Sequence, residues 1–179
     1  MRLLFFLLTS VSCLLTPAFS QQVGPSSIYP DATLTPGATD MRVTQANIKK
    51  TICVPNYTAT VRPAVTVTNK IKAASMLAYG DTKPQAKLPM KGKALDTSKC
   101  VAHSSEPRCY ELDHLISLEI GGCPDCVINL WPEPYNPVPG AHQKDQVENS
   151  FHRAVCSGTM TLADAQKQIV SDWYAHFKK

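Results

Sequence analysis

The sequence contains only one long apolar stretch, residues 3–15, which is shorter than the roughly 20 residues that a helix needs to span a bilayer. A membrane-spanning helix is therefore not expected. Arg2 precedes this stretch, and Pro17 and the small residues Ala18 and Ser20 follow it, which is the pattern of a secretory signal peptide. We predict a signal peptide over residues 1–20 and a secreted or periplasmic mature protein without membrane contact.

Charged residues are also scarce, at 18% of the sequence, and the formal net charge is only +4 at pH 7. Loss of Arg2 with the signal peptide lowers this charge by one. Domains that bind nucleic acids usually carry a stronger basic stripe. The charge therefore permits an anionic partner such as nucleic acid but does not by itself indicate one.

The mature chain has an even number of cysteines, which in an exported protein predicts a disulfide framework, although six cysteines allow many pairings. A zinc knuckle built from two CxxC pairs is disfavoured because the sequence has a single CxxC. The first of the three disulfides we favour would close a long loop and contribute about 3 to 5 kcal/mol in the chain-entropy model. The favoured pairs are Cys53 with Cys156, Cys100 with Cys109, and Cys123 with Cys126.

The first half of the mature chain gives weak structural signals. Residues 21–45 are rich in Pro, Ser, Thr and Gly and predict a flexible leader, so the folded domain is expected to span residues 46–179. Residues 51–61 alternate like short strands or extended loops. A helix is expected from Thr66 or Thr68 to about Tyr79, ended by Gly80.

Residues 81–108 contain prolines and lysines without a sustained apolar pattern and predict a long surface loop. Such loops are uncommon unless they have a function, although a tolerated insertion is an equal alternative. The lysines of this loop could add phosphate contacts.

The second half is more informative. Residues 110–120 suit a strand and its turn, which Gly121 and Gly122 end, and residues 127–130 predict a second short strand. The prolines that follow, between positions 132 and 139, predict an irregular connector.

Two helices are expected at the C-terminal end. The first runs from Ala141 to about Cys156 and is stopped by Gly158. Thr161 and Asp164 form a capping box that starts the second helix. Trp131 and Trp173 are expected to be core residues.

The order of these features resembles the HNH endonuclease family. The resemblance rests on YELDHLISLEIGG at residues 110–122 and NLWP at residues 129–132, and a wider resemblance to small secreted bacterial proteins of HNH-like type covers roughly residues 48–175. It implies an α+β fold with a ββα-metal core, flanking helices and stapling disulfides.

Phosphodiester hydrolysis explains why these residue types belong together. A neutral imidazole whose other nitrogen is held by a backbone carbonyl can deprotonate water, and we expect His114 to be this general base. The resemblance implies that Asp113 binds a metal ion, although in a regular strand it would point away from His114 unless the strand twists or ends there. Asn129 would supply a second metal ligand or orient the base.

The last ligand of the family pattern is a His or Asn on the helix, and the candidate here is His142. On a helical wheel His142 lies opposite the buried stripe, whereas Lys144 and Glu148 flank that stripe. Lys144 is an equally reasonable phosphate contact or transition-state stabiliser. The oxygen-rich ligand set favours Mg²⁺, with Mn²⁺ or Zn²⁺ as other options.

Two functions from different classes remain open. The first is a secreted metal-dependent nuclease that hydrolyses DNA, RNA or both. The second is a catalytically inactive, disulfide-stabilised binding or structural module on the same scaffold, because a fold does not dictate a function.

Overall fold

The computed structural model describes residues 28–80, 96–101, 106–136 and 138–177. The predicted signal peptide, residues 21–27 of the predicted leader, and residues 81–95 and 102–105 of the predicted surface loop lie outside these residues. The helices and strands are α1 (Tyr57–Val61), α2 (Val65–Ala78), β1 (Tyr110–His114), β2 (Leu130–Pro134), α3 (Ala141–Ser157) and α4 (Leu162–Phe177). Short 3₁₀ helices span Gln45–Lys50, Thr97–Lys99, Pro107–Cys109, Leu118–Ile120 and Val127–Asn129. The expected α+β class is confirmed.

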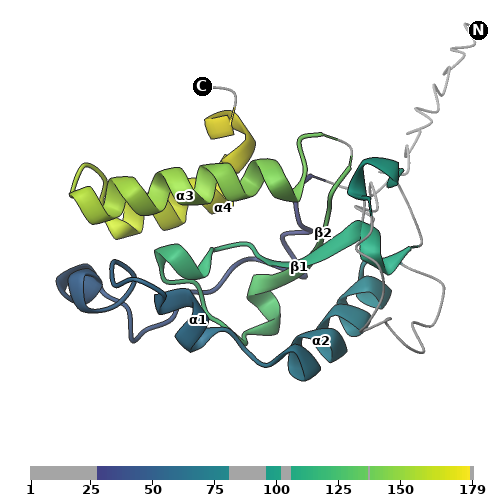
Figure 1. Cartoon of the computed structure of the whole chain (residues 1–179), viewed down its shortest axis with the longest axis horizontal. Helices are drawn as coiled ribbons and strands as arrows, with labels where there is room; N and C mark the ends of the chain where they lie inside the picture. The colour runs from purple at the N-terminus through teal and green to yellow at the C-terminus, as the bar shows by residue number, and fades with distance from the viewer. Residues whose placement is uncertain (1–27, 81–95, 102–105, 137, 178–179) are drawn as a thin grey trace, which may run out of the picture.

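The two strands form an antiparallel pair in the middle of the molecule. Tyr110 lies opposite Pro134 at one end, and His114 lies opposite Leu130 at the other. Figure 1 shows α3 and α4 on one side of this pair and α1 and α2 on the other. The sheet is thereby covered by helices from both halves of the chain.

The main hydrophobic core lies where α3 and α4 pack against each other and against the turn at Leu118–Ile120. Phe151 and Val155 of α3 meet Ile169 and Trp173 of α4 in this core. Trp173 is 1% exposed and Trp131, which belongs to a smaller cluster, is fully buried, so both tryptophans occupy the expected core positions.

The prediction of a flexible leader is wrong for residues 28–45. The Gly37 backbone N–H donates to the Ile128 carbonyl, and the Asp40 N–H donates to the Gly121 carbonyl, at 3.0 and 2.8 Å. Val43 is buried in the main core. This segment has too few apolar residues to show periodicity, and it is ordered by backbone hydrogen bonds to a distant loop.

Two further expectations are corrected. Residues 51–61 do not form strands, because α1 begins at Tyr57. The second strand begins at Leu130 rather than at residue 127 and includes Pro132 and Pro134. Proline is tolerated here because each strand of a two-stranded sheet has one unpaired edge, where a missing N–H costs nothing.

The predicted disulfide pairing is confirmed in full. Cys53 pairs with Cys156, Cys100 with Cys109 and Cys123 with Cys126, with Cα–Cα distances of 5.6, 5.4 and 5.6 Å. Three disulfides are typical of a protein that resides in an oxidising extracellular or periplasmic compartment. Within the described ranges, no helix has the length and apolar character needed to cross a bilayer.

Candidate functional site

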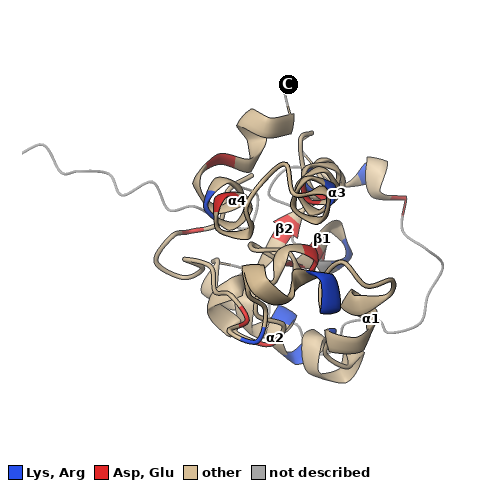
Figure 2. Cartoon of the chain, turned by 90° about the vertical axis from the view of Figure 1, so that its left-hand side faces the viewer, with Lys and Arg blue, Asp and Glu red and all other residues tan. Residues whose placement is uncertain are grey.

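A polar cavity of about 100 Å³ lies between the end of β1, α1 and α3. Five of the side chains that line it are carboxylates, and Arg62 is its one lining cation among the described residues. Figure 2 shows how acidic positions gather at the strands and on α3. The cavity is lined by Thr58, Arg62, Glu111, Leu112, Asp113, His114, Ser117, Leu118, Glu119, Asp145, Glu148 and Asn149.

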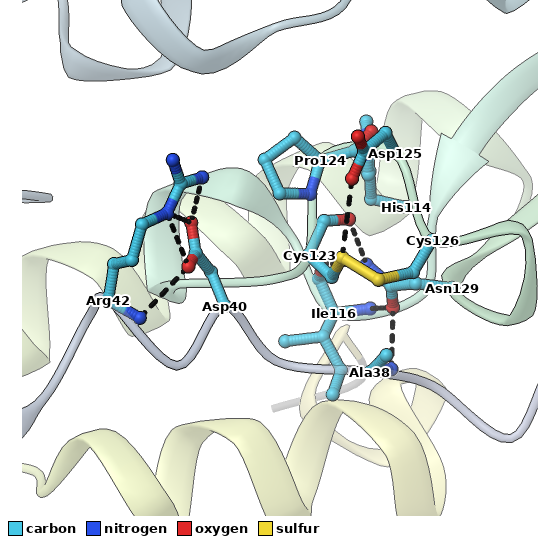
Figure 3. Close-up of a disulfide and its surroundings, with 10 residues drawn as sticks. All are labelled: Ala38, Asp40, Arg42, His114, Ile116, Cys123, Pro124, Asp125, Cys126 and Asn129. Atoms are coloured by element: carbon cyan, nitrogen blue, oxygen red, sulfur yellow. Dashed lines mark hydrogen bonds and ion pairs between the residues drawn. A yellow bond between two sulfur atoms is a disulfide. The ribbon is translucent and has the colours of Figure 1, made fainter.

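His114 is the last residue of β1, and its imidazole is held by a loop carbonyl. The distance from Nε2 to the Pro124 carbonyl oxygen is 2.9 Å (Figure 3). Because a carbonyl can only accept, Nε2 carries the proton, and Nδ1 is the unprotonated nitrogen of the neutral ring. Burial lowers the pKa of His114, which keeps the ring neutral near physiological pH. The side chain therefore has the state that a general base requires.

Asp113 and His114 line the same cavity although they are neighbours in a strand. Strand alternation would send them to opposite faces, but β1 ends at His114 and the chain turns away there. For Asp113 and His114 to face the same site, the sequence required a strand end or a twist, and β1 does end at His114.

Lys144 binds Asp113 from α3. Its ammonium donates to Asp113 Oδ2 at 2.7 Å, to the His114 carbonyl oxygen at 3.0 Å and to Glu148 Oε1. Burial alone would lower the pKa of Lys144, but Asp113, Glu148 and Glu133 outweigh burial and raise it. The lysine is therefore charged, and at 1% side-chain exposure it stabilises the buried carboxylates rather than contacting a phosphate.

Glu111 and Glu133, two other carboxyl groups of this region, are not among the hydrogen-bond partners of the Lys144 ammonium. Burial raises the pKa of Glu111 to about 7, with further contributions from Asp113 and Asp145. Glu133 is fully buried, neither of its oxygens accepts a hydrogen bond, and burial together with Asp113 raises its pKa well above the ordinary value. When protonated, Glu133 can donate a hydrogen bond to Asp113, and this bond is one of the causes of the raised pKa.

Asn129 does not line the cavity, and its amide is fully used by the backbone. Its oxygen accepts from the Ile116 and Ala38 N–H groups at 3.0 and 3.2 Å. Its nitrogen donates to the Ile116 and Cys123 carbonyls at 3.0 and 3.1 Å. The expected roles as metal ligand or as direct partner of the base therefore do not fit this placement, since Pro124 holds the imidazole and Asn129 holds the loop.

His142 does not reach the cavity either. It is exposed in the first turn of α3, and its ring centroid lies 4.9 Å from that of Tyr135. Because α3 begins at Ala141, regular helical geometry carries His142 away from Lys144, as the helical wheel indicated. Asp113, Asn129 and His142 thus do not converge on one cation.

Two other groups of side chains have spacing that could hold a metal ion. They are Cys53, His152 and Cys156, and Cys123, Asp125 and Cys126, with ligand atoms within 4.8 Å of one another. In both groups the cysteines are joined in a disulfide. Their thiolates would become ligands only after reduction.

Glu111, which lines the cavity, and the buried Glu133 were missed from the sequence, and so was the ion pair between Lys144 and Glu148. Glu111 and Asp113 are two residues apart in a strand, which is a signal that both lie on one face. Lys144 and Glu148 have the i,i+4 spacing of an ion pair. Glu133 carried no signal because the prolines around it hid β2.

Comparison of the chain with models of known families, with curated proteins and with solved structures found no match. The site is therefore interpreted from its own chemistry. It combines a neutral imidazole, carboxylates that can attract a cation, and an exposed guanidinium, that of Arg62, that can attract an anion.

Proposed function

We propose that this protein hydrolyses phosphodiester bonds of nucleic acids with His114 as the general base, in an HNH-like ββα arrangement of β1, β2 and α3. The observation that carries the proposal is the imidazole itself, which has Nε2 bound to the Pro124 carbonyl and Nδ1 left as the basic nitrogen. This state, at the wall of a polar cavity, is what deprotonation of a water molecule requires.

In the proposed reaction, water attacks the phosphorus atom while one of its protons passes to Nδ1 of His114. The bond between phosphorus and the leaving ester oxygen breaks, and that oxygen takes up a proton from solvent. The imidazolium then returns its proton to solvent. Arg62 is exposed at the cavity and carries the charge to bind the phosphate.

A divalent cation fits the oxygen donors of the cavity. Glu111 and Asp145 would hold it, because neither is bound to Lys144 and because burial and neighbouring carboxylates raise the pKa of both. Carboxylate oxygens suit Mg²⁺, and Mn²⁺ is the alternative. When bound, such an ion supplies neutralisation of the phosphate and of the developing charge on the leaving oxygen.

One observation favours the second function, an inactive binding or structural module. The ammonium of Lys144 already neutralises Asp113 and Glu148. A cavity balanced in this way can persist without a metal ion and without catalysis.

A cleavage assay separates the two functions. Oxidised protein is incubated with plasmid DNA or RNA in Mg²⁺, Mn²⁺ or EDTA, beside the variants His114→Ala and His142→Ala. We expect metal-dependent cleavage that falls about 10²- to 10⁴-fold in His114→Ala. His142→Ala is the matched control, because its side chain lies outside the cavity. Absence of cleavage by folded wild-type protein with every metal would favour the inactive module.

A further inference from the structure

We propose that the Cys123–Cys126 disulfide is a positioning device for His114, because it fixes the backbone carbonyl that orients the imidazole. Only Pro124 and Asp125 separate the two cysteines. The cross-link therefore closes a turn of four residues, and the carbonyl that accepts from His114 Nε2 lies inside this turn (Figure 3).

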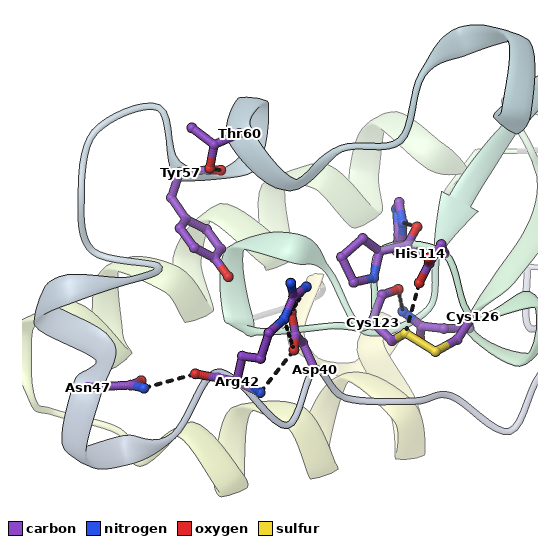
Figure 4. A network of polar contacts seen from close by, with 11 residues as sticks. Asp40, Arg42, Asn47, Tyr57, Thr60, His114, Cys123 and Cys126 are labelled. Atoms are coloured by element: carbon purple, nitrogen blue, oxygen red, sulfur yellow. Dashed lines mark hydrogen bonds and ion pairs between the residues drawn. A yellow bond between two sulfur atoms is a disulfide. The ribbon is translucent and has the colours of Figure 1, made fainter.

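Both ends of the disulfide turn are anchored to the rest of the fold. The Cys123 N–H donates to the Ala38 carbonyl at 2.9 Å, and the Cys123 carbonyl accepts from the side chain of Asn129 at 3.1 Å. At the other end, the Cys126 carbonyl accepts from the Asn129 N–H at 2.8 Å. The disulfide joins these two anchored residues, Cys123 and Cys126, and lies close to the imidazole of His114 (Figure 4).

The approach to the turn is equally restricted. Gly122 precedes Cys123, and a Cβ atom at Gly122 would lie 1.7 Å from the Ile116 carbonyl oxygen. The backbone can make this approach only at a glycine. A turn held at both ends, entered through a glycine and closed by a cross-link leaves the Pro124 carbonyl little freedom to move.

The bond to Pro124 is the contact that sets how the ring of His114 is presented. With the carbonyl in place, the ring has one orientation and one protonated nitrogen. If the turn relaxes, the ring can rotate about its side-chain bonds, and Nδ1 loses its fixed position. The positioning itself is independent of catalysis, and its effect on cleavage rests on the proposed function.

The test compares two disulfide-deleted variants by NMR. Cys123→Ser/Cys126→Ser removes the positioning disulfide, and Cys100→Ser/Cys109→Ser is the matched control, because that disulfide lies at the opposite end of β1 from His114. The Nε2–H resonance of His114, assigned by its loss in His114→Gln, should be protected from solvent exchange in wild-type protein. We expect exchange to accelerate at least about tenfold in the first variant and to stay unchanged in the control.

Two results would overturn the inference. The first is a His114 Nε2–H exchange rate in Cys123→Ser/Cys126→Ser that equals the wild-type rate. The second is an equal increase of this rate in both variants. If Cys123→Ser/Cys126→Ser does not fold, a second variant carries a glycine inserted between Pro124 and Asp125, which keeps the disulfide but lengthens the turn. The Nε2–H proton of His114 should exchange faster in this variant as well. Exchange as slow as in the wild type would refute the inference.

Cleavage is measured in parallel and should fall up to about 100-fold in Cys123→Ser/Cys126→Ser, as expected for a displaced catalytic group. If wild-type protein does not cleave nucleic acid, the proposed function fails while the exchange data still decide the positioning role.

Discussion

Replacement of Lys144 by Met should destabilise the protein strongly at pH 8, and the penalty should grow as the pH rises above 8. The substitution removes the ammonium that binds Asp113 Oδ2 at 2.7 Å and also binds Glu148. Breaking a buried ion pair by removal of one partner costs about 3 to 5 kcal/mol, because the remaining charge is left uncompensated.

The pH dependence follows from Glu148. Burial raises the pKa of Glu148 to about 8, although Lys144 acts to lower it. Below pH 8, Glu148 is therefore mostly protonated with or without Lys144 and adds little to the penalty. Above pH 8 the wild-type carboxylate is ionised beside Lys144, whereas the variant must keep this group protonated, at a further cost of about 1.4 kcal/mol for each pH unit.

Urea unfolding of the oxidised protein at pH 8 and pH 9, followed by the fluorescence of the buried Trp131 and Trp173, measures the penalty. Lys167→Met is the matched control, because Lys167 is exposed on α4, and it should change the unfolding free energy by less than about 0.5 kcal/mol. A Lys144→Met penalty below about 1 kcal/mol at pH 8, or a penalty at pH 9 no larger than at pH 8, would refute the reasoning.

Three more outcomes are expected. Asn129→Ala removes the partner of four backbone groups, three of them in buried hydrogen bonds, and should cost about 3 kcal/mol or more in urea unfolding, whereas a loss below about 1 kcal/mol would contradict its structural role. Glu133 has a raised folded pKa, so its contribution to stability is complete below pH 4.5 and is lost as the pH rises through the folded pKa. Glu133→Gln should therefore lose less stability than wild type between pH 5 and pH 8, and parallel stability curves would argue against a raised pKa of Glu133. If Arg62 binds the phosphate, Arg62→Ala should lower kcat/KM for cleavage about tenfold or more with an unchanged melting temperature, and Arg153→Ala should not.

The parts of the fold that were predictable carry strong local signals. The end of α3 at Gly158, which has a φ of 82°, follows from the glycine alone. The start of α4 follows from Thr161 and Asp164, whose side chain and backbone bonds form the predicted cap. The even number of mature cysteines predicted a disulfide framework, and the three favoured pairs are the ones that form.

The parts that were not predictable depend on distant partners. β2 contains two prolines, and its strand character comes from pairing with β1 rather than from local propensity. Residues 28–45 are ordered by bonds such as that from the Asp40 N–H to the Gly121 carbonyl, between positions far apart in the sequence. A single sequence does not report such pairings.

The site divides in the same way. The chemistry of His114 was predicted as far as a ring nitrogen held by a backbone carbonyl, but the carbonyl could not be identified, because it belongs to a turn beyond the end of the strand. Asn129 was recognised as important and assigned the wrong task, because an amide serves equally as a ligand and as a backbone clamp until its neighbours are known.

Two independent contacts fix His114, one at its backbone and one at its imidazole. Lys144 donates to the His114 carbonyl oxygen and so ties the main chain of this residue to the buried charges of α3. Pro124 accepts from the ring and ties the side chain to the disulfide turn. One contact holds the backbone of His114 and the other holds its ring. Loss of either contact therefore leaves one of these two parts free to move. A histidine that is restrained at both points, with one nitrogen left as a base, is better explained by a demand for orientation than by a demand for packing.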